Sequence, residues 1–280
     1  MTTGGARFPD GHFYSPVIDR SEVRAAAGRI WPAHPDVRGV DFNAAGQREL
    51  LREIFPKYIG DYDYPETLPE GSDPQRFFDR NPAFGWLDSA LFVLLRHWRP
   101  QRVVEVGSGY STLLMADVNR RFLGRRADIR CIEPYPAPYL TPPPDGVVEV
   151  IPSRVQDVPL EIFDGLAAGD VLFIDSSHVS KIGSDVNHLM FEVLPRLATG
   201  VHIHFHDIFL PYDYPRDWVL ELGLYWNEQY VVRAMLTLTR GFRVTFGSAY
   251  ASVACADDVA AALAPGSPCG GASFWIEKIA

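Results

Sequence analysis

Short apolar runs alternate with helical patterns through the middle of the chain. Five runs predict strands: Arg102 to Val106, Ile129 to Glu133, Val147 to Ile151, Val171 to Asp175 and Val201 to Phe205. Apolar spacing predicts helices over Trp86 to Trp98, Ser111 to Phe122 and about Ser184 to Leu194. Strands joined through helices or long loops form mainly parallel sheets covered on both faces. The predicted fold class is therefore α/β, a doubly wound sheet.

The two ends of the chain differ from this middle part. Pro215 suits the first turn of a helix through Met235, and Phe242 to Phe246 and Ser273 to Ile279 predict two closing strands, with a short Ala-rich helix and a Gly/Pro/Ser linker between them. The first eighty residues are irregular and rich in aromatics, with helical spacing over Ala44 to Phe55. We expect an N-terminal extension, 1–84, packed on a domain that spans 85–280.

Composition and charge exclude some classes of partner. The chain has 280 residues, with 26 Lys plus Arg against 35 Asp plus Glu, a net charge of −9. Nucleic-acid binding needs a basic surface that releases counterions, and the sequence has no basic stripe. No apolar stretch approaches the roughly 20 residues of a membrane span. Whether copies of the chain associate into a homo-oligomer stays open.

Three cysteines and the first thirty residues bear on the compartment. Cys131, Cys255 and Cys269 are odd in number and lack metal-ligand spacing, so we expect reduced thiols. The opening residues lack a basic flank followed by an apolar block, which predicts that no signal peptide is present. Together these features favour a cytoplasmic protein.

A glycine turn follows the first strand, in Glu105-Val106-Gly107-Ser108-Gly109. Ligands of doubly wound sheets bind outside the carboxyl ends of the strands, and glycines let a ligand approach the backbone closely. A dinucleotide fingerprint would need a third glycine where the chain has Thr112. Glu105 suits a cationic amino group, the helix beginning near Ser111 suits a carboxylate, and Glu133 is placed to accept two ribose hydroxyls. A ligand with all three groups is S-adenosylmethionine.

The residues Val103 to Ser111, Glu133 and Phe173-Ile174-Asp175 resemble successive motifs of the class I S-adenosylmethionine-dependent methyltransferases. Further segments resemble the small-molecule methyltransferase domain family 24: Gly107 to Thr112, Asp175-Ser176-Ser177-His178, His206-Asp207-Ile208-Phe209 and Gly11 to Pro16. The resemblance covers roughly 85–280 and implies a seven-stranded sheet whose last strand is antiparallel. It departs from the usual pattern at Ser111, where a third glycine is common. The cofactor residues predicted from these motifs are Glu105, Gly107, Ser108, Gly109, Tyr110, Ser111, Glu133, Gln156 and Asp175.

A second group of polar residues follows the fourth and fifth strands. Asp175, His178, His206 and Asp207 are expected to converge beside the cofactor, because neighbouring parallel strands lie about 4.8 Å apart. Methyl transfer to a hydroxyl needs a base, and a neutral imidazole of His206 or His178 suits that task near pH 7. A second interpretation uses Asp175, His206 and Asp207 to bind a divalent metal ion. Such a nitrogen and oxygen donor set suits a transition metal better than magnesium.

Two further groups have competing interpretations. His202, His204 and His206 alternate on one side of their strand and resemble a comb of metal ligands, but we favour His202 and His204 as packed, hydrogen-bonded histidines. Phe13 and Tyr14 are candidates for a lid over the site, while Trp218 and Trp226 have the spacing of core residues.

The sequence thus predicts a methyltransferase that uses S-adenosylmethionine on a hydroxyl of a small molecule, for example a sugar or another natural-product intermediate. Two alternatives are a nicotinamide-dependent oxidoreductase and a module that binds the cofactor without methylating.

Overall fold

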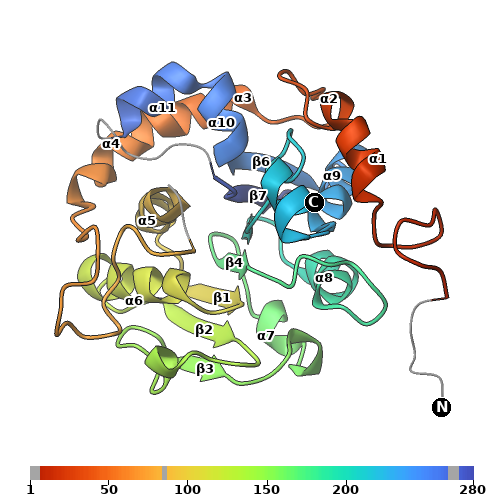
Figure 1. Ribbon diagram of the computed structural model, residues 1–280. Coiled ribbons are helices and arrows are strands. Elements are labelled where there is room, and N and C mark those ends of the chain that lie inside the picture. Colours follow the sequence, from red (N-terminus) through yellow and green to blue (C-terminus); the bar gives the residue numbers. More distant parts are fainter. Residues whose placement is uncertain (1–6, 84–86, 264–270) are drawn as a thin grey trace, which may run out of the picture.

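A seven-stranded sheet forms the centre of the computed structural model, which describes residues 7–83, 87–263 and 271–280. The strand order is β3-β2-β1-β4-β5-β7-β6 (Figure 1). The strands are β1 (Arg102–Val106), β2 (Asp128–Ile132), β3 (Glu149–Ile151), β4 (Val171–Ile174), β5 (His202–Phe205), β6 (Phe242–Gly247) and β7 (Phe274–Lys278). Neighbours among β1 to β5 pair in parallel, and β7 is antiparallel to both β5 and β6. The predicted sheet is confirmed, with strand ends within two residues of expectation.

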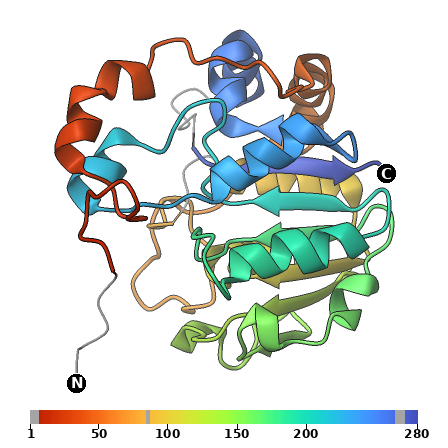
Figure 2. The same cartoon turned by 90° about the vertical axis from the view of Figure 1, so that its right-hand side faces the viewer.

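Helices cover both faces of this sheet (Figures 1 and 2). One core lies between the sheet and α5, α6, α10 and α11, and the other lies between the sheet and α7, α8 and α9. The longer of these helices are α5 (Leu87–Trp98), α6 (Tyr110–Phe122) and α9 (Glu228–Leu238). The shorter ones are α7 (Glu161–Asp164), α8 (Asp185–His188), α10 (Ser248–Ala254) and α11 (Ala256–Ala262). Pro100 follows the end of α5, as expected from a residue that cannot continue a helix.

A π-helical turn and a 3₁₀ turn extend one of these helices, α8. Helix α8 continues as η5 (Leu189–Val193) and η6 (Leu194–Arg196), which together match the helix expected from Ser184. The Ser184 side chain caps α8 by accepting the backbone N–H of Asn187. Three further short turns lie in connections: η3 (Pro138–Leu140), η4 (Val155–Asp157) and η7 (Trp218–Leu222).

The single long helix expected from Pro215 through Met235 is wrong. A helical turn ends at η7, and α9 begins only at Glu228. Gly223, with φ 73°, adopts the left-handed conformation that terminates a helix. The apolar spacing on either side is helical, which explains why periodicity alone missed the interruption.

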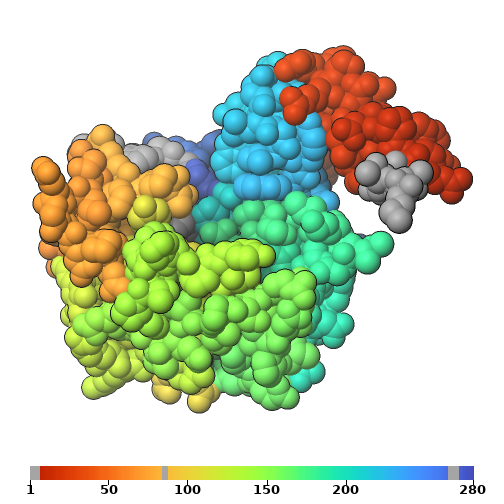
Figure 3. Space-filling model, turned by 60° about the horizontal axis from the view of Figure 1, so that its bottom comes forward, coloured from red at the N-terminus to blue at the C-terminus, as the bar shows by residue number. Residues whose placement is uncertain are grey.

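The N-terminal extension contacts the sheet domain along much of its length, and Phe42 is buried in the second core. Its elements are α1 (Arg20–Ala25), α2 (Ala27–Ile30), α3 (Ala44–Glu49), η1 (Leu50–Ile54), α4 (Phe55–Tyr58) and η2 (Ile59–Asp61). Residues 44–64 pack beside α5 and α6, where Leu51 and Phe55 are buried. The segment containing α1 and α2 lies against residues 210–225, with the Trp31 indole N–H donating to the carbonyl of Tyr214. Figure 3 shows these two parts, red and orange, on opposite sides of the molecule.

Several predictions made from the sequence concern individual residues or boundaries. The proposed domain boundary at 84/85, Trp86 and Cys269 lie outside the described residues. Cys131 and Cys255 are free and buried, as expected for reduced thiols. Phe13 and Tyr14 are 80% and 66% exposed, so a lid role stays a prediction. Among the described helices, none combines the length and apolar content needed to cross a bilayer.

Candidate active site at the carboxyl ends of β1, β2, β4 and β5

The turn between β1 and α6 is fixed by one glycine. Gly107 has φ 83°, and a Cβ built on it would lie 2.0 Å from the carbonyl oxygen of Asp175. Only glycine fits this position. At Gly109 a Cβ would meet only the Tyr139 hydroxyl, at 4.0 Å. The turn therefore touches the end of β4 through Gly107 and leaves Gly109 accessible.

Glu105 lies beneath this turn and is fully buried. Its two carboxylate oxygens accept hydrogen bonds from the hydroxyls of Ser111 and Thr112, at 2.5 and 2.6 Å. Burial raises the pKa of Glu105 to about 7, although both hydroxyls act in the opposite direction. In the ligand-free protein Glu105 therefore braces the start of α6. A direct contact between Glu105 and a ligand amino group stays a prediction.

A cavity of about 450 Å³ opens beside the turn, at the ends of β1, β2 and β4. Four of the predicted cofactor residues line it: Gly107, Glu133, Gln156 and Asp175. The Glu133 carboxylate accepts the backbone N–H groups of Ser108 and Tyr135, at 3.2 and 2.8 Å. A carboxylate has about four acceptor positions, so Glu133 keeps further positions for ligand hydroxyls. The volume lies within the usual range for small-molecule sites, roughly 300–1,000 Å³.

The remaining predicted cofactor residues lie on the other side of the turn. Ser111 is buried against Glu105, and the Tyr110 ring packs against Tyr139, with ring centroids 5.7 Å apart. Ser108 contacts the cavity wall only through its backbone bond to Glu133. The nine residues thus form a cavity-facing group and a supporting group.

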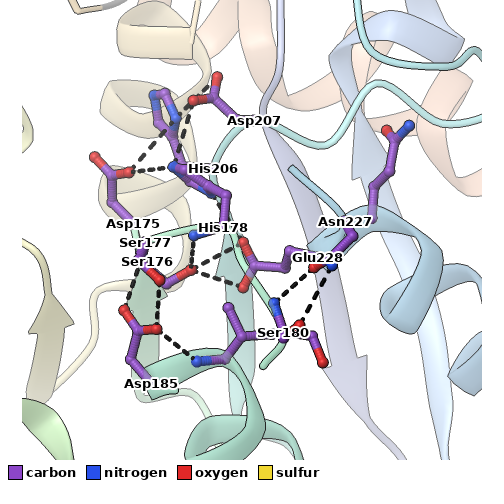
Figure 4. A network of polar contacts seen from close by, with 12 residues as sticks. Asp175, Ser176, Ser177, His178, Ser180, Asp185, His206, Asp207, Asn227 and Glu228 are labelled. Carbon is purple, nitrogen blue, oxygen red and sulfur yellow. Dashed lines mark hydrogen bonds and ion pairs between the residues drawn. The ribbon is translucent and has the colours of Figure 1, made fainter. Parts of the chain in front are cut away.

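The four residues expected to converge after β4 and β5 do so (Figure 4). His178 Nε2 lies 3.3 Å from Asp175 Oδ1 and 3.5 Å from Asp207 Oδ2. His206 Nδ1 lies 3.1 Å from Asp207 Oδ1 and 3.7 Å from Asp175 Oδ1. His178 and Asp207 both have positive φ values, 59° and 55°. Left-handed backbone is uncommon for residues other than glycine, although Asp and His adopt it more often than most, and it clusters at functional sites.

Electrostatics couple these groups. Burial opposes the charge on Asp175, but the imidazoles of His206 and His178 outweigh it and lower the pKa of Asp175 to about 2. Burial also opposes protonation of His178, yet hydrogen bonds to Asp175 and Glu228 raise its pKa to about 10. Asp175 and Asp207 raise the pKa of His206 against the effect of burial. The raised pKa of His178 favours its protonated form in the ligand-free state, and the role of a neutral imidazole as the base stays a prediction.

Donor atoms of Asp175, His178 and His206 all lie within 4.8 Å of one another, close enough for one ion to bind. Asp207 contacts both imidazoles. The residues present therefore fit a divalent ion, with His178 joining the three ligands predicted from sequence. Two imidazoles and two carboxylates are donors that suit a transition metal.

Comparisons with known proteins give the family. Residues 104–208 match the family model described as a methyltransferase domain. An uncharacterised protein of Archaeoglobus fulgidus is 41% identical over 170 residues, which cover 58% of this chain and 75% of the relative. The chain belongs to the methyltransferase domain family. The resemblance to the class I S-adenosylmethionine-dependent methyltransferases is thereby confirmed.

Solved structures that are similar to this chain include an O-methyltransferase and a putative O-methyltransferase. TomG of Streptomyces achromogenes, an O-methyltransferase of tomaymycin synthesis in complex with SAM, is 16% identical, covers 93% of this chain and 96% of its own, and has a TM-score of 0.42. A putative O-methyltransferase from Klebsiella pneumoniae is 16% identical, with coverages of 94% and 96% and a TM-score of 0.42.

Sequence reasoning missed one buried acid of this methyltransferase domain. Glu228 is 1% exposed, and its carboxylate lies 2.9 Å from His178 Nδ1. The continuous helix expected through this region gave Glu228 no reason to differ from its neighbours. The only sequence signal was an acid two residues after Trp226, whose ring packs on His178 with centroids 4.3 Å apart.

Two histidines of β5 lie outside the polar cluster, as favoured over the metal comb. His202 stacks on Trp98, and His204 packs between Phe173 and Trp275, with centroids 3.7, 4.0 and 4.7 Å apart. The expected hydrogen bonds are wrong for His204, because neither of its ring nitrogens has a hydrogen-bond partner among the described residues. Aromatic stacking takes their place.

Proposed function

We propose that this protein transfers a methyl group from S-adenosylmethionine to a hydroxyl oxygen of a small molecule. The observation that carries the proposal is that the cavity and the polar cluster share Asp175. Its side chain lines the cavity beside Gly107 and Glu133, and the same carboxylate contacts His178 and His206. A cofactor held in the cavity would therefore lie next to groups that accept a proton.

S-adenosylmethionine supplies a methyl group on a positively charged sulfur, which departs as a neutral thioether. The task left to the protein is to bind the two reactants in line and to take the hydroxyl proton as the new carbon–oxygen bond forms. Glu133 accepts ribose hydroxyls in this proposal, Gly107 permits close approach, and Gln156 lies on the cavity wall. His178 and His206 are the two candidate bases.

The raised pKa of His178 has a consequence for this role. An imidazolium cannot accept a proton, whereas a cation placed nearby lowers the pKa of an imidazole. The sulfonium is such a cation. We therefore assign the proton-accepting form of the imidazole to the protein with its cofactor bound.

A divalent ion is a second way to activate the acceptor at the same place. Asp175, His178 and His206 would hold it, with Asp207 beside them, and it would lower the pKa of a bound hydroxyl. Chelation separates the two routes: full turnover after treatment with EDTA and metal analysis showing less than one ion per chain would exclude the ion.

Calorimetry on the purified protein tests the proposal. We expect binding of S-adenosylmethionine and S-adenosylhomocysteine, with no binding of NADH under the same conditions. A panel of sugars, phenols and catechols then tests methyl transfer through a mass increase of one methyl group. Absence of binding for both sulfur compounds would reject the proposal. Binding without any methylated product would favour a cofactor-binding module instead.

A further inference from the structure

Glu228 approaches the polar cluster from a direction that neither β4 nor β5 supplies. It is the first residue of α9, and its carboxylate is almost fully buried. Its Oε2 lies 2.9 Å from His178 Nδ1, and the Ser176 hydroxyl lies 3.0 Å from each of its oxygens (Figure 4). A buried carboxylate is costly unless it is paired and hydrogen-bonded. Here His178 and Ser176 together provide that pairing.

The same turn holds the backbone of His178. The N–H groups of Asn227 and Glu228 donate to the His178 carbonyl, at 3.0 and 3.1 Å, and the Ser176 hydroxyl accepts the His178 N–H at 3.0 Å. The Trp226 ring packs on the imidazole. The ring of His178 is therefore fixed on one edge by Glu228 and on one face by Trp226, and its remaining nitrogen points at Asp175 and Asp207.

This arrangement determines which ring nitrogen carries the proton. An ionised carboxylate only accepts hydrogen bonds, so His178 Nδ1 has to be an N–H donor toward Glu228. When the imidazole is neutral, its lone pair then lies on Nε2, the nitrogen that faces the cluster. We propose that Glu228 is a positioning residue that keeps the proton on His178 Nδ1 and thereby presents Nε2 as the acceptor of the hydroxyl proton. This inference rests on the proposed methyl transfer and selects His178 over His206 as the base.

A Glu228→Gln variant tests the proposal with little change of volume. A neutral amide binds the Nδ1 proton less strongly and can donate to Nδ1 instead, so the proton is no longer held there. We expect kcat to fall at least about 100-fold, the range of a mispositioned base, while KM for S-adenosylmethionine changes less than about threefold. Kinetics use the panel acceptor that is methylated fastest. Glu228→Asp, which retains the charge with shorter reach, should recover part of the loss.

Nitrogen NMR of protein labelled in its histidines gives a readout that does not depend on turnover. In the wild-type protein with S-adenosylmethionine bound, the His178 Nδ1 signal, assigned by its loss in His178→Gln, should be of the protonated type and the Nε2 signal of the unprotonated type. In Glu228→Gln the Nδ1 signal should move toward the unprotonated type. Glu221→Gln is the matched control, because Glu221 makes an exposed ion pair with Arg24 at 3.0 Å. It should leave both kcat and the signal unchanged.

The outcomes separate the two proposals. An unprotonated Nδ1 in the wild-type protein, or wild-type kcat in Glu228→Gln, would overturn the role of Glu228 and leave methyl transfer intact. Equal losses in kcat and cofactor affinity would show that Glu228 acts only on the fold, which also overturns the positioning role. Failure of the wild-type protein to methylate any acceptor would count against the proposed function, while the NMR signal would still report whether Glu228 holds the proton.

Discussion

His202 and His204 on β5 and His206 directly after it alternate along the chain, and the three imidazoles have different environments. His206 lies at the carboxyl end among Asp175 and Asp207, and its pKa is raised against burial. His202 stacks on Trp98, and burial lowers its pKa to about 4. His204 lies between aromatic rings, and burial lowers its pKa well below the usual value. Position along the chain therefore decides which imidazole lies among carboxylates and which lies among aromatic rings.

The largest expected difference is in turnover. His206→Ala removes the imidazole that contacts Asp175 and Asp207, the two carboxylates that face His178 Nε2, and should misplace them and lower kcat about 100-fold, with the affinity for S-adenosylmethionine nearly unchanged. His202→Phe keeps the stacking on Trp98 and should retain wild-type kcat. Steady-state kinetics and calorimetry on both variants measure this. Equal activity of the two variants would remove His206 from the mechanism.

The second largest expected difference is in the free energy of unfolding. His206→Leu leaves the Asp175 and Asp207 carboxylates short of a counter-charge and should lower the free energy of unfolding by at least about 2 kcal/mol. His204→Leu removes two nitrogens that lack hydrogen bonds, which offsets the lost stacking, so the change should be below about 1 kcal/mol. Urea denaturation compares the two. Similar losses in both variants would mean that the cluster contributes no special stabilisation.

The smallest expected effect is on the stability of the fold at acidic pH. Because the pKa of His202 is lowered in the folded state, the unfolded chain binds a proton more readily, and stability falls as the pH drops from about 6.5 toward 4. His202→Phe should lose less Tm than the wild-type protein between pH 7 and pH 4.5, by a few degrees at most. Thermal melts across this range measure the slope. Parallel curves would show that His202 does not titrate differently on folding.

The strands and the convergence of Asp175, His178, His206 and Asp207 could be predicted because both follow from local patterns: apolar runs, a glycine turn and the common edge of parallel strands. The position of Glu228 against His178 could not be predicted, because Gly223 interrupts a helical pattern that otherwise continues. The packing of His204 against Trp275 joins residues 71 positions apart, 275 − 204, which no local pattern records. The inward orientation of Glu105 likewise depends on hydroxyls from the next helix.

The contact between Gly107 and Asp175 limits which substitutions this part of the protein can accept. The backbone N–H of Asp175 donates to the Val106 carbonyl at 2.8 Å, and the space beside Gly107 admits no methyl group. The turn between β1 and α6 is thereby fixed against the carboxyl end of β4, so neither segment can shift without the other. Under the proposed function, a change in the choice of acceptor would therefore have to arise in segments outside this contact.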